Sequence, residues 1–208
     1  METGTFNGGG ALFLASILAL VHPMGRVHTI DPWKRRFHKS YAKWDAPARR
    51  IFNAHVAHHG SHGPTEHALA TALFSPWRAC TVRVAQVTYH PNSSVDAPVV
   101  EIIRSAARAV EGPVLVVLDS NHAASFVTKE LDAYAPLVTV GSYVVVEDMK
   151  LDRMLRGIDS KGPAAKQWAG PTPAVQAFLR ENRHFRADRA MESLWYTQHP
   201  AGFLKRTR

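Results

Sequence analysis

Two short apolar segments that each end in acidic residues constrain the fold of this chain more than any other feature. The first segment, residues 114–118, is followed by Asp119, and the second, residues 142–146, is followed by Glu147 and Asp148. Both segments are continuously rich in Val and Leu rather than alternating with polar residues. We therefore expect each to form a strand that is buried on both faces of a sheet.

The residues between these strands are spaced as in an amphipathic helix. Apolar side chains recur at Phe126, Val127, Leu131 and Tyr134, and the polar residues Lys129, Glu130 and Asp132 occupy other positions of the segment. A right-handed crossover through this helix makes the two strands parallel, so that their carboxyl ends open on one edge of the sheet, where α/β sheets bind ligands. One crevice is therefore predicted to contain Asp119, His122, Glu147 and Asp148.

Acidic residues gathered at one sheet edge predict a cation site. Carboxylates held close together repel each other and raise each other's pKa unless a cation neutralises them. Oxygen ligands suit Mg²⁺ or Mn²⁺ better than zinc, which prefers more His or Cys. The alternative is that Asp119 caps the following helix and that Glu147 and Asp148 are solvated loop residues.

Composition is that of a soluble globular protein with one domain. The 208 residues are 46% hydrophobic and carry a formal net charge of +8. The densest basic run, Trp33–Lys39, is interpreted as a solvated face or a contact for an anionic ligand, so nucleic acid is not an expected partner. The single cysteine, Cys80, excludes an internal disulfide.

The apolar stretch Ala11–Val21 is too short to span a bilayer and has no basic residue before it, unlike a signal peptide. We interpret it as a buried helix and expect a cytoplasmic protein with no membrane partner.

A glycine-rich turn, Met1–Gly10, leads into this helix, and a predicted strand, Arg26–Asp31, follows it and ends in an acid. Such a loop, with an acid that can hold two ribose hydroxyls, is typical of sites for nucleoside-containing cofactors, although glycine loops also serve as plain turns.

The segment 33–80 is interpreted as a variable insertion. It contains five histidines between His55 and His67, whose spacing matches no metal-binding pattern, so a surface insertion is favoured over a metal site. A strand is predicted at 81–88 and a helix at 97–110.

The segment after Asp148 is rich in Gly and Pro, and residues 149–172 are predicted to form a lid-like loop. Thr172 is predicted to cap a helix over Pro173–Glu181. Two closing strands are expected, at 185–188 and 193–198.

Several motifs together resemble the cephalosporin hydroxylase family. They are Leu118–His122, Glu130-Leu131 with Tyr134–Pro136, Gly141–Asp148, Gly170-Pro171, Pro200–Lys205, and the opening Glu2–Thr5 with Gly8-Gly9. The resemblance spans nearly the whole chain except residues 33–80. It implies the α/β, Rossmann-like fold of class I S-adenosylmethionine-dependent methyltransferases, with a mostly parallel sheet and helices on both faces. The family includes sugar and macrolide O-methyltransferases.

The resemblance also implies roles for individual residues. The Mg²⁺ ligands would be Asp119, Glu147 and Asp148, and His122 would be the general base. S-adenosylmethionine would be bound by Glu2, Gly4, Gly8, Asp31 and Ser94, with Asp31 on the ribose and Ser94 near the adenine. The expected function is Mg²⁺-dependent O-methylation of a hydroxyl of a sugar, polyketide or similar small molecule.

Two departures from the family pattern accompany this expectation. The chain begins at the glycine loop, so it is expected to be truncated at its first strand, and Gly10 stands where the family often has serine. The alternatives are a catalytically degenerate member and a hydroxylase-type enzyme, which would need a redox-active metal and a further histidine ligand. The sequence leaves the substrate and the oligomeric state open, a homo-oligomer being one alternative.

Overall fold

The computed structural model describes residues 1–5, 9–22, 24–32, 86–153, 169–192 and 197–208. The chain divides into two compact units, which are considered separately below. An N-terminal unit comprises Glu2–Ser94, and a C-terminal unit comprises Val95–Arg208 together with Met1. The predicted insertion at 33–80 lies outside the described residues, as does the part of the predicted lid from 154 to 168.

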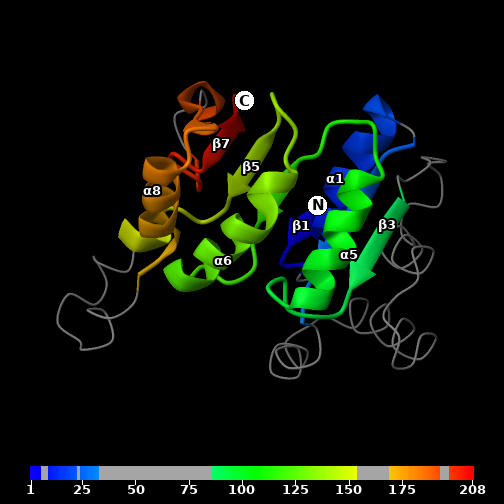
Figure 1. Ribbon diagram of the computed structural model, residues 1–208, viewed down its shortest axis with the longest axis horizontal. Coiled ribbons are helices and arrows are strands. Elements are labelled where there is room, and N and C mark those ends of the chain that lie inside the picture. Colours follow the sequence, from blue (N-terminus) through cyan, green and yellow to red (C-terminus); the bar gives the residue numbers. More distant parts are fainter. Residues whose placement is uncertain (6–8, 23, 33–85, 154–168, 193–196) are drawn as a thin grey trace. The chain divides into compact units, whose positions relative to one another are not determined.

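Within its described residues, the N-terminal unit contains three parallel strands and one helix (Figure 1). Its elements are β1 (Glu2–Thr3), α1 (Gly9–Val21), β2 (Arg26–Ile30) and β3 (Gln86–His90). β2 pairs in parallel with both β1 and β3. The small residues Ala11 and Ala15 let α1 pack closely on the strands, where they form a buried cluster with Val27 and Val87.

The predicted elements of this unit agree with the structure. α1 contains the expected helix at 11–21, and β2 contains the expected strand at 26–31 except for its last residue. β3 begins at Gln86 and ends at His90, two residues beyond the predicted end, whereas residues 81–85 lie outside the described part. A first strand precedes the glycine loop, in the form of the two residues of β1.

The C-terminal unit alternates helices and strands. In chain order its elements are α5 (Ala97–Arg108), β4 (Val116–Leu118), α6 (Ala124–Tyr134), the 3-10 helix η2 (Ala135–Leu137), β5 (Tyr143–Val146), α8 (Pro171–Glu181), β6 (Phe185–Ala187), the 3-10 helix η3 (Arg189–Glu192) and β7 (Phe203–Arg206). The strand order is β4-β5-β7-β6. β4 and β5 are parallel, and β7 runs antiparallel to both of its neighbours.

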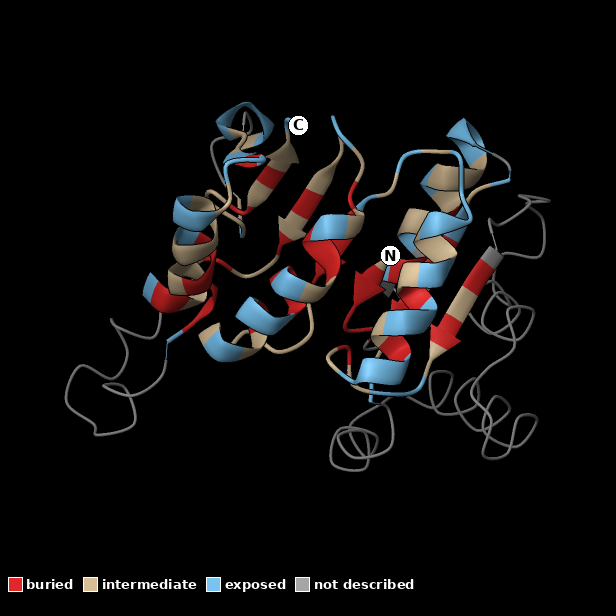
Figure 2. Ribbon diagram, in the orientation of Figure 1, coloured by how far each residue is buried: buried red, intermediate tan, exposed pale blue. Residues whose placement is uncertain are grey.

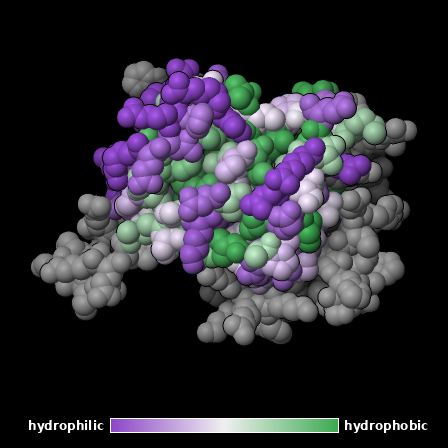
Figure 3. Space-filling view, in the orientation of Figure 1, coloured by the Kyte–Doolittle hydropathy of each residue, from purple (hydrophilic) through white to green (hydrophobic). Residues whose placement is uncertain are grey.

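Burial in the C-terminal unit follows the apolar pattern with two exceptions. β4 is buried at every residue, as predicted, but β5 alternates between buried and half-buried residues, because Tyr143 and Val145 are partly accessible (Figure 2). Glu130, a charged residue of α6, is only 1% exposed and lies on the same face as the buried Val127 and Tyr134. The outward surface of α8 carries mainly hydrophilic side chains, whereas that of α5 is mixed and includes the exposed Ile102 (Figure 3).

The start of α8 differs from the prediction. The helix begins at Pro171, so Thr172 lies inside it rather than at its cap, and the Thr172 hydroxyl donates to the Met149 carbonyl. The buried Asp152 carboxylate accepts the backbone N–H groups of Gly170 and Thr172, at 2.7 and 2.8 Å. A carboxylate from outside the helix therefore satisfies its first donors, a contact that the local sequence does not reveal.

The last strand also differs from the prediction. β6 confirms the strand expected at 185–188, but the strand that pairs with it is β7 at 203–206 rather than 193–198. Residues 193–196 lie outside the described part, and residues 197 and 198 are not in a strand.

The predicted Rossmann-like α/β fold with mostly parallel strands is confirmed. Among the described residues, no helix is both long and apolar enough to cross a membrane.

Candidate functional site: an acidic cluster at the ends of β4 and β5

The carboxyl ends of β4 and β5 bring acidic residues to one edge of the C-terminal unit. Leu118 lies opposite Val146 in the parallel register, and the Glu147 N–H donates to the Leu118 carbonyl at 2.9 Å. The residues that follow each strand, Asp119 on one side and Asp148 on the other, are therefore neighbours. The predicted proximity of Asp119 and Asp148 is therefore observed.

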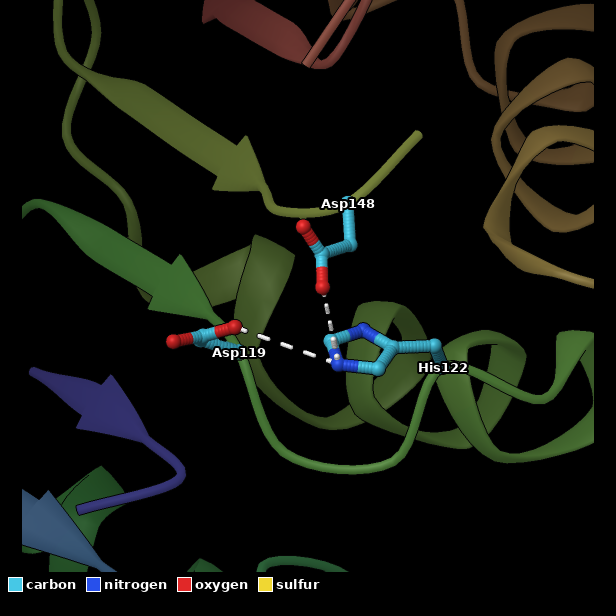
Figure 4. Close-up of side chains that lie close together, drawn as sticks. All are labelled: Asp119, His122 and Asp148. Atoms are coloured by element: carbon cyan, nitrogen blue, oxygen red, sulfur yellow. Dashed lines mark ion pairs between the residues drawn. The ribbon is translucent and has the colours of Figure 1, made fainter. Parts of the chain in front are cut away.

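Asp119, His122 and Asp148 form a cluster, in which one potential ligand atom from each residue lies within 4.8 Å of the others (Figure 4). His122 Nε2 is 3.4 Å from Asp148 Oδ2 and 4.0 Å from Asp119 Oδ1. The side chains of Asp119 and Asp148 are 42% and 40% exposed, and that of His122 is 24% exposed. The cluster is thus accessible to a ligand from solution.

The loop that carries Asp119 and His122 is held from within the unit. The Ser120 hydroxyl donates to Glu130 Oε1 at 2.7 Å, and Asn121 Oδ1 accepts the Ala123 N–H. This explains the burial of Glu130, which fixes the loop from the underlying helix. Burial and the nearby Glu130 raise the pKa of Tyr134 in the same helix well above its usual range.

Glu147 points to a different partner. Its Oε2 lies 3.2 Å from Nε2 of His199, which itself accepts the Asp148 N–H at Nδ1, also at 3.2 Å. Because a backbone N–H can only donate, Nδ1 has no proton and the imidazole hydrogen is on Nε2, facing Glu147. Burial lowers the pKa of His199, while the nearby Asp148 charge opposes this effect. The contact with Glu147 is therefore a hydrogen bond from a neutral imidazole.

Burial, and after it the negative charge of Asp148, raises the pKa of Glu147. A positive charge placed beside these carboxylates would reverse that effect. Two accessible carboxylates match the donor chemistry of a divalent cation such as Mg²⁺, which uses one or two protein carboxylates and takes its other ligands from water or substrate. Glu147 lies outside the three-residue cluster, so its predicted role as a metal ligand stays a prediction.

The residues predicted to bind the cofactor belong to the N-terminal unit. Gly4 follows β1, has a φ of 84° that favours glycine, and donates its N–H to the Ile30 carbonyl. Asp31 follows the parallel strand β2, and the Tyr89 hydroxyl donates to its carbonyl. Gly4 and Asp31 therefore lie at the carboxyl ends of two adjacent strands.

The remaining predicted cofactor residues differ in exposure. Glu2 and Ser94 are 4% and 2% exposed, and the Thr29 hydroxyl donates to Glu2 Oε2 at 2.7 Å. Gly8 lies outside the described residues. A Cβ atom at Gly10 would lie 2.0 Å from Glu2 Oε1, so this carboxylate occupies the space that a serine would need. The departure from serine at this position thus has a local physical reason.

Sequence reasoning missed His199 and Gly202 in the C-terminal unit. A Cβ atom at Gly202 would lie 2.4 Å from the Val146 carbonyl oxygen, so only glycine allows the chain to pass this close to the end of β5. Gly202 lies within the family motif Pro200–Lys205, although that motif does not reveal its contact with β5, and nothing in the local sequence links His199 to Glu147, which is more than fifty residues away.

The chain is similar in sequence to several curated methyltransferases. Rhamnosyl O-methyltransferases of Mycobacterium bovis (strain BCG / Pasteur 1173P2) and Mycobacterium tuberculosis (strain ATCC 25618 / H37Rv) are each 26% identical to this chain over 210 residues. These alignments cover 99% of the chain, which spans 66% of the length of these relatives. The rhamnosyl O-methyltransferase of Mycobacterium leprae (strain TN) is 30% identical over 100 residues, which are 48% of this chain and 40% of that protein.

Among solved structures, the MycE methyltransferase from the mycinamycin biosynthetic pathway, in complex with Mg and SAH, matches with a TM-score of 0.38 and 14% identity. The match covers 88% of this chain and 45% of MycE. The sequence model of the rhamnosyl O-methyltransferase/CmcI family matches residues 78–207, which include all of the acidic cluster and more than half of the chain. This chain therefore belongs to the rhamnosyl O-methyltransferase/CmcI family.

Proposed function

We propose that this protein is an Mg²⁺-dependent O-methyltransferase, which transfers the methyl group of S-adenosylmethionine to a hydroxyl of a sugar, polyketide or similar small molecule. The observation that carries the proposal is the accessible cluster of Asp119, His122 and Asp148 at the ends of β4 and β5. The match to the family model and the names of the mycobacterial relatives support the choice of reaction.

The donor set divides the work between a cation and a base. Asp119 and Asp148, with Glu147 as the further predicted ligand, would hold Mg²⁺, which prefers oxygen donors over imidazole nitrogen. When bound, the cation would lower the pKa of a substrate hydroxyl. His122 is then left to accept the proton at Nε2, the atom that lies between the two aspartates.

The proposed methyl transfer needs no reactant besides the substrate hydroxyl, S-adenosylmethionine and His122 as the proton acceptor. The substrate oxygen attacks the methyl carbon of the sulfonium, a C–O bond forms, and the C–S bond breaks with its electron pair remaining on sulfur. The hydroxyl proton goes to His122. Since the methyl donor is already activated, much of the acceleration would come from holding the two substrates in attack geometry.

The N-terminal unit would supply the cofactor site. Asp31, at the carboxyl end of β2, is suited to accept hydrogen bonds from two ribose hydroxyls, and Gly4 at the end of β1 allows the ligand to approach the backbone. Glu2, Gly8 and Ser94 complete the proposed set. Metal and cofactor sites can be tested separately, because each uses residues of a different unit.

The test is calorimetric titration with Mn²⁺ and with S-adenosylmethionine, together with transfer of labelled methyl to a panel of vicinal diols. We expect Asp119→Asn to lose both cation binding and transfer while still binding S-adenosylmethionine. The exposed Asp132 in α6 provides a matched control, since Asp132→Asn removes the same charge from the same unit. Undiminished transfer by EDTA-treated protein would disprove the role of the cation.

A degenerate relative would give a different pattern in the same experiment. It would bind S-adenosylmethionine and would transfer no methyl group to any diol.

A hydroxylase-type enzyme would need a second histidine free to ligate a redox metal. Within the described residues, the other histidine at this edge is His199, whose two ring nitrogens are bonded to Glu147 and to the Asp148 N–H. This observation favours the methyltransferase.

A further inference from the structure

His199 contacts both residues of the Glu147-Asp148 pair through different ring nitrogens. Nδ1 accepts the Asp148 main-chain N–H, and Nε2–H faces the Glu147 carboxylate, both at 3.2 Å. The ring is 18% exposed and meets Phe203 edge to face, with ring centroids 5.8 Å apart. One imidazole thus fixes a main-chain group and a side chain of two consecutive residues.

The loop that presents His199 is itself held firmly. The His199 N–H donates to Thr197 Oγ1, and its carbonyl accepts the Gly202 N–H at 2.8 Å. The Gly202 carbonyl in turn accepts the Val146 N–H at the end of β5, at 2.9 Å. The Ala201 N–H donates to Glu192 Oε1. The backbone that carries the His199 imidazole is therefore hydrogen-bonded directly to β5, the strand that precedes Glu147 and Asp148.

Asp148 has a main-chain conformation that needs such support. Its φ is 55°, in the left-handed region that L-residues rarely adopt, although Asp tolerates it better than most. In this conformation the two consecutive side chains diverge: Glu147 reaches His199, whereas Asp148 reaches His122 at 3.4 Å. An acceptor for the Asp148 N–H stabilises the turn that separates them.

We propose that His199 is a positioning residue, which holds the Asp148 main chain and the Glu147 carboxylate so that the Asp148 side chain faces Asp119 and His122. The inference rests on the proposed function, because it treats the cluster as a cation site. His199 makes no contact with the cation in this role. It acts in its neutral form with the proton on Nε2, as a partner behind the ligands.

Substitutions that restore one ring nitrogen at a time test this role. Asn places its amide oxygen near the position of Nδ1 and can accept the Asp148 N–H, whereas Gln places its amide group near the position of Nε2 and can donate to Glu147. We expect His199→Ala to weaken Mn²⁺ binding by roughly 10- to 100-fold, as is typical for residues behind metal ligands. His199→Asn should restore most of this loss, and His199→Gln should restore less.

Two controls separate positioning from general damage. His184→Ala removes an exposed imidazole from the same unit and should leave Mn²⁺ binding unchanged. Thermal unfolding by circular dichroism shows whether each variant is folded. Unchanged Mn²⁺ affinity in folded His199→Ala would overturn the proposal. So would a loss that neither Asn nor Gln reduces, because it would point to packing against Phe203 instead.

Nuclear magnetic resonance without any cation separates failure of this inference from failure of the proposed function. The ¹⁵N shifts of the His199 ring should report the Nε2–H tautomer, and the Asp148 amide signal should move in His199→Ala and return in His199→Asn. The other tautomer, or an unmoved Asp148 amide, would overturn the positioning role. A wild-type protein that shows these signals and binds no Mn²⁺ would overturn the proposed function while supporting the two hydrogen bonds.

Discussion

The two units place their histidines beside different partners. In the C-terminal unit, His122 lies between two aspartates and His199 lies 3.2 Å from Glu147. In the N-terminal unit, His28 on β2 and His90 on β3 lie against each other, with Nδ1 of one 3.1 Å from Nε2 of the other. Their rings are stacked, with centroids 5.4 Å apart.

These surroundings give the same side chain different properties. A hydrogen bond between two imidazoles needs one donor nitrogen and one acceptor nitrogen, so at least one of the two rings must be neutral. Burial, and after it the neighbouring His90, lowers the pKa of His28 to about 4, and burial lowers the pKa of His90. The His28–His90 pair thus links two strands as an uncharged contact, whereas the carboxylates around His122 attract a proton or a cation.

The largest effect is expected from removing negative charge at the cluster. Asp148→Asn keeps the shape of the side chain but supplies no charge for a cation, so Mn²⁺ affinity should fall on the order of 100-fold or more, beyond the loss typical of residues behind the ligands. Calorimetric titration measures it. His28→Gln, in the other unit, is the matched comparison and should leave Mn²⁺ affinity unchanged. Equal losses in both variants would contradict the division of roles between the units.

A smaller effect is expected from crowding the loop beside β5. In Gly202→Ala, the new methyl group would lie 2.4 Å from the Val146 carbonyl oxygen, a contact that forces the backbone to move. We expect a loss of about 2 to 3 kcal/mol in the free energy of unfolding, as is usual for overpacking, and weaker Mn²⁺ binding through His199. Urea unfolding gives the first quantity and calorimetry the second.

Gly112→Ala is the control for this substitution, because a Cβ atom there would meet no atom within 4 Å. Its free energy of unfolding should match that of the wild type. If Gly202→Ala were as stable as Gly112→Ala, the close approach of the loop to β5 would not constrain His199.

How far the sequence could predict this arrangement depends on the distance between the interacting residues. The Val-rich segments and the helical spacing between them are local patterns, and they correctly gave β4, α6 and β5. Parallel pairing then implies that Asp119 and Asp148 meet, because a crossover through a helix brings both strand ends to one edge. The core of the candidate site was therefore predictable from short-range patterns and one topological rule.

The parts that were missed depend on contacts between segments that are distant in the sequence. His199 reaches Glu147 only because β7 pairs antiparallel with β5. Asp152 lies 20 residues before Thr172 and takes its place as the group that satisfies the start of α8, which is again a contact between segments distant in the sequence. Glu130 lies three residues after Val127 and four before Tyr134, so its position belongs to the buried face of α6, and the hydrogen bond from Ser120 is a contact that local sequence does not reveal.

A buried acidic residue of the N-terminal unit, Glu2, allows a prediction with an effect of intermediate size on stability. Glu2 is 4% exposed and receives a hydrogen bond from the buried Thr29, which also contacts Thr5 at 2.7 Å. Thr29→Val keeps the shape but removes this donor from a buried carboxylate, and should cost about 1 to 2 kcal/mol in the free energy of unfolding. Thr128→Val, at an exposed position of α6, is the control, since the Thr128 hydroxyl donates to the Ala124 carbonyl of the preceding turn. Equal losses in urea unfolding would argue against a structural role for the Glu2 contact.

The smallest effect is expected at His28 and depends on pH. Because the pKa of His28 is about 4 in the folded protein and 6.5 ordinarily, the unfolded chain binds a proton in this window and the folded protein does not. The free energy of unfolding therefore falls as the pH drops from 6.5 toward 4. Above pH 6.5, where His28 is neutral in both the folded and the unfolded chain, its titration causes no destabilisation. His28→Gln should leave the free energy of unfolding nearly unchanged at pH 7.5 and should make its decline between pH 6.5 and 4 shallower. Urea unfolding across this range, with His184→Gln as the exposed control, measures the slope. A slope equal to that of the wild type would mean that the His28–His90 pair is not held neutral, and the contrast between the two units would then rest on the acidic cluster alone.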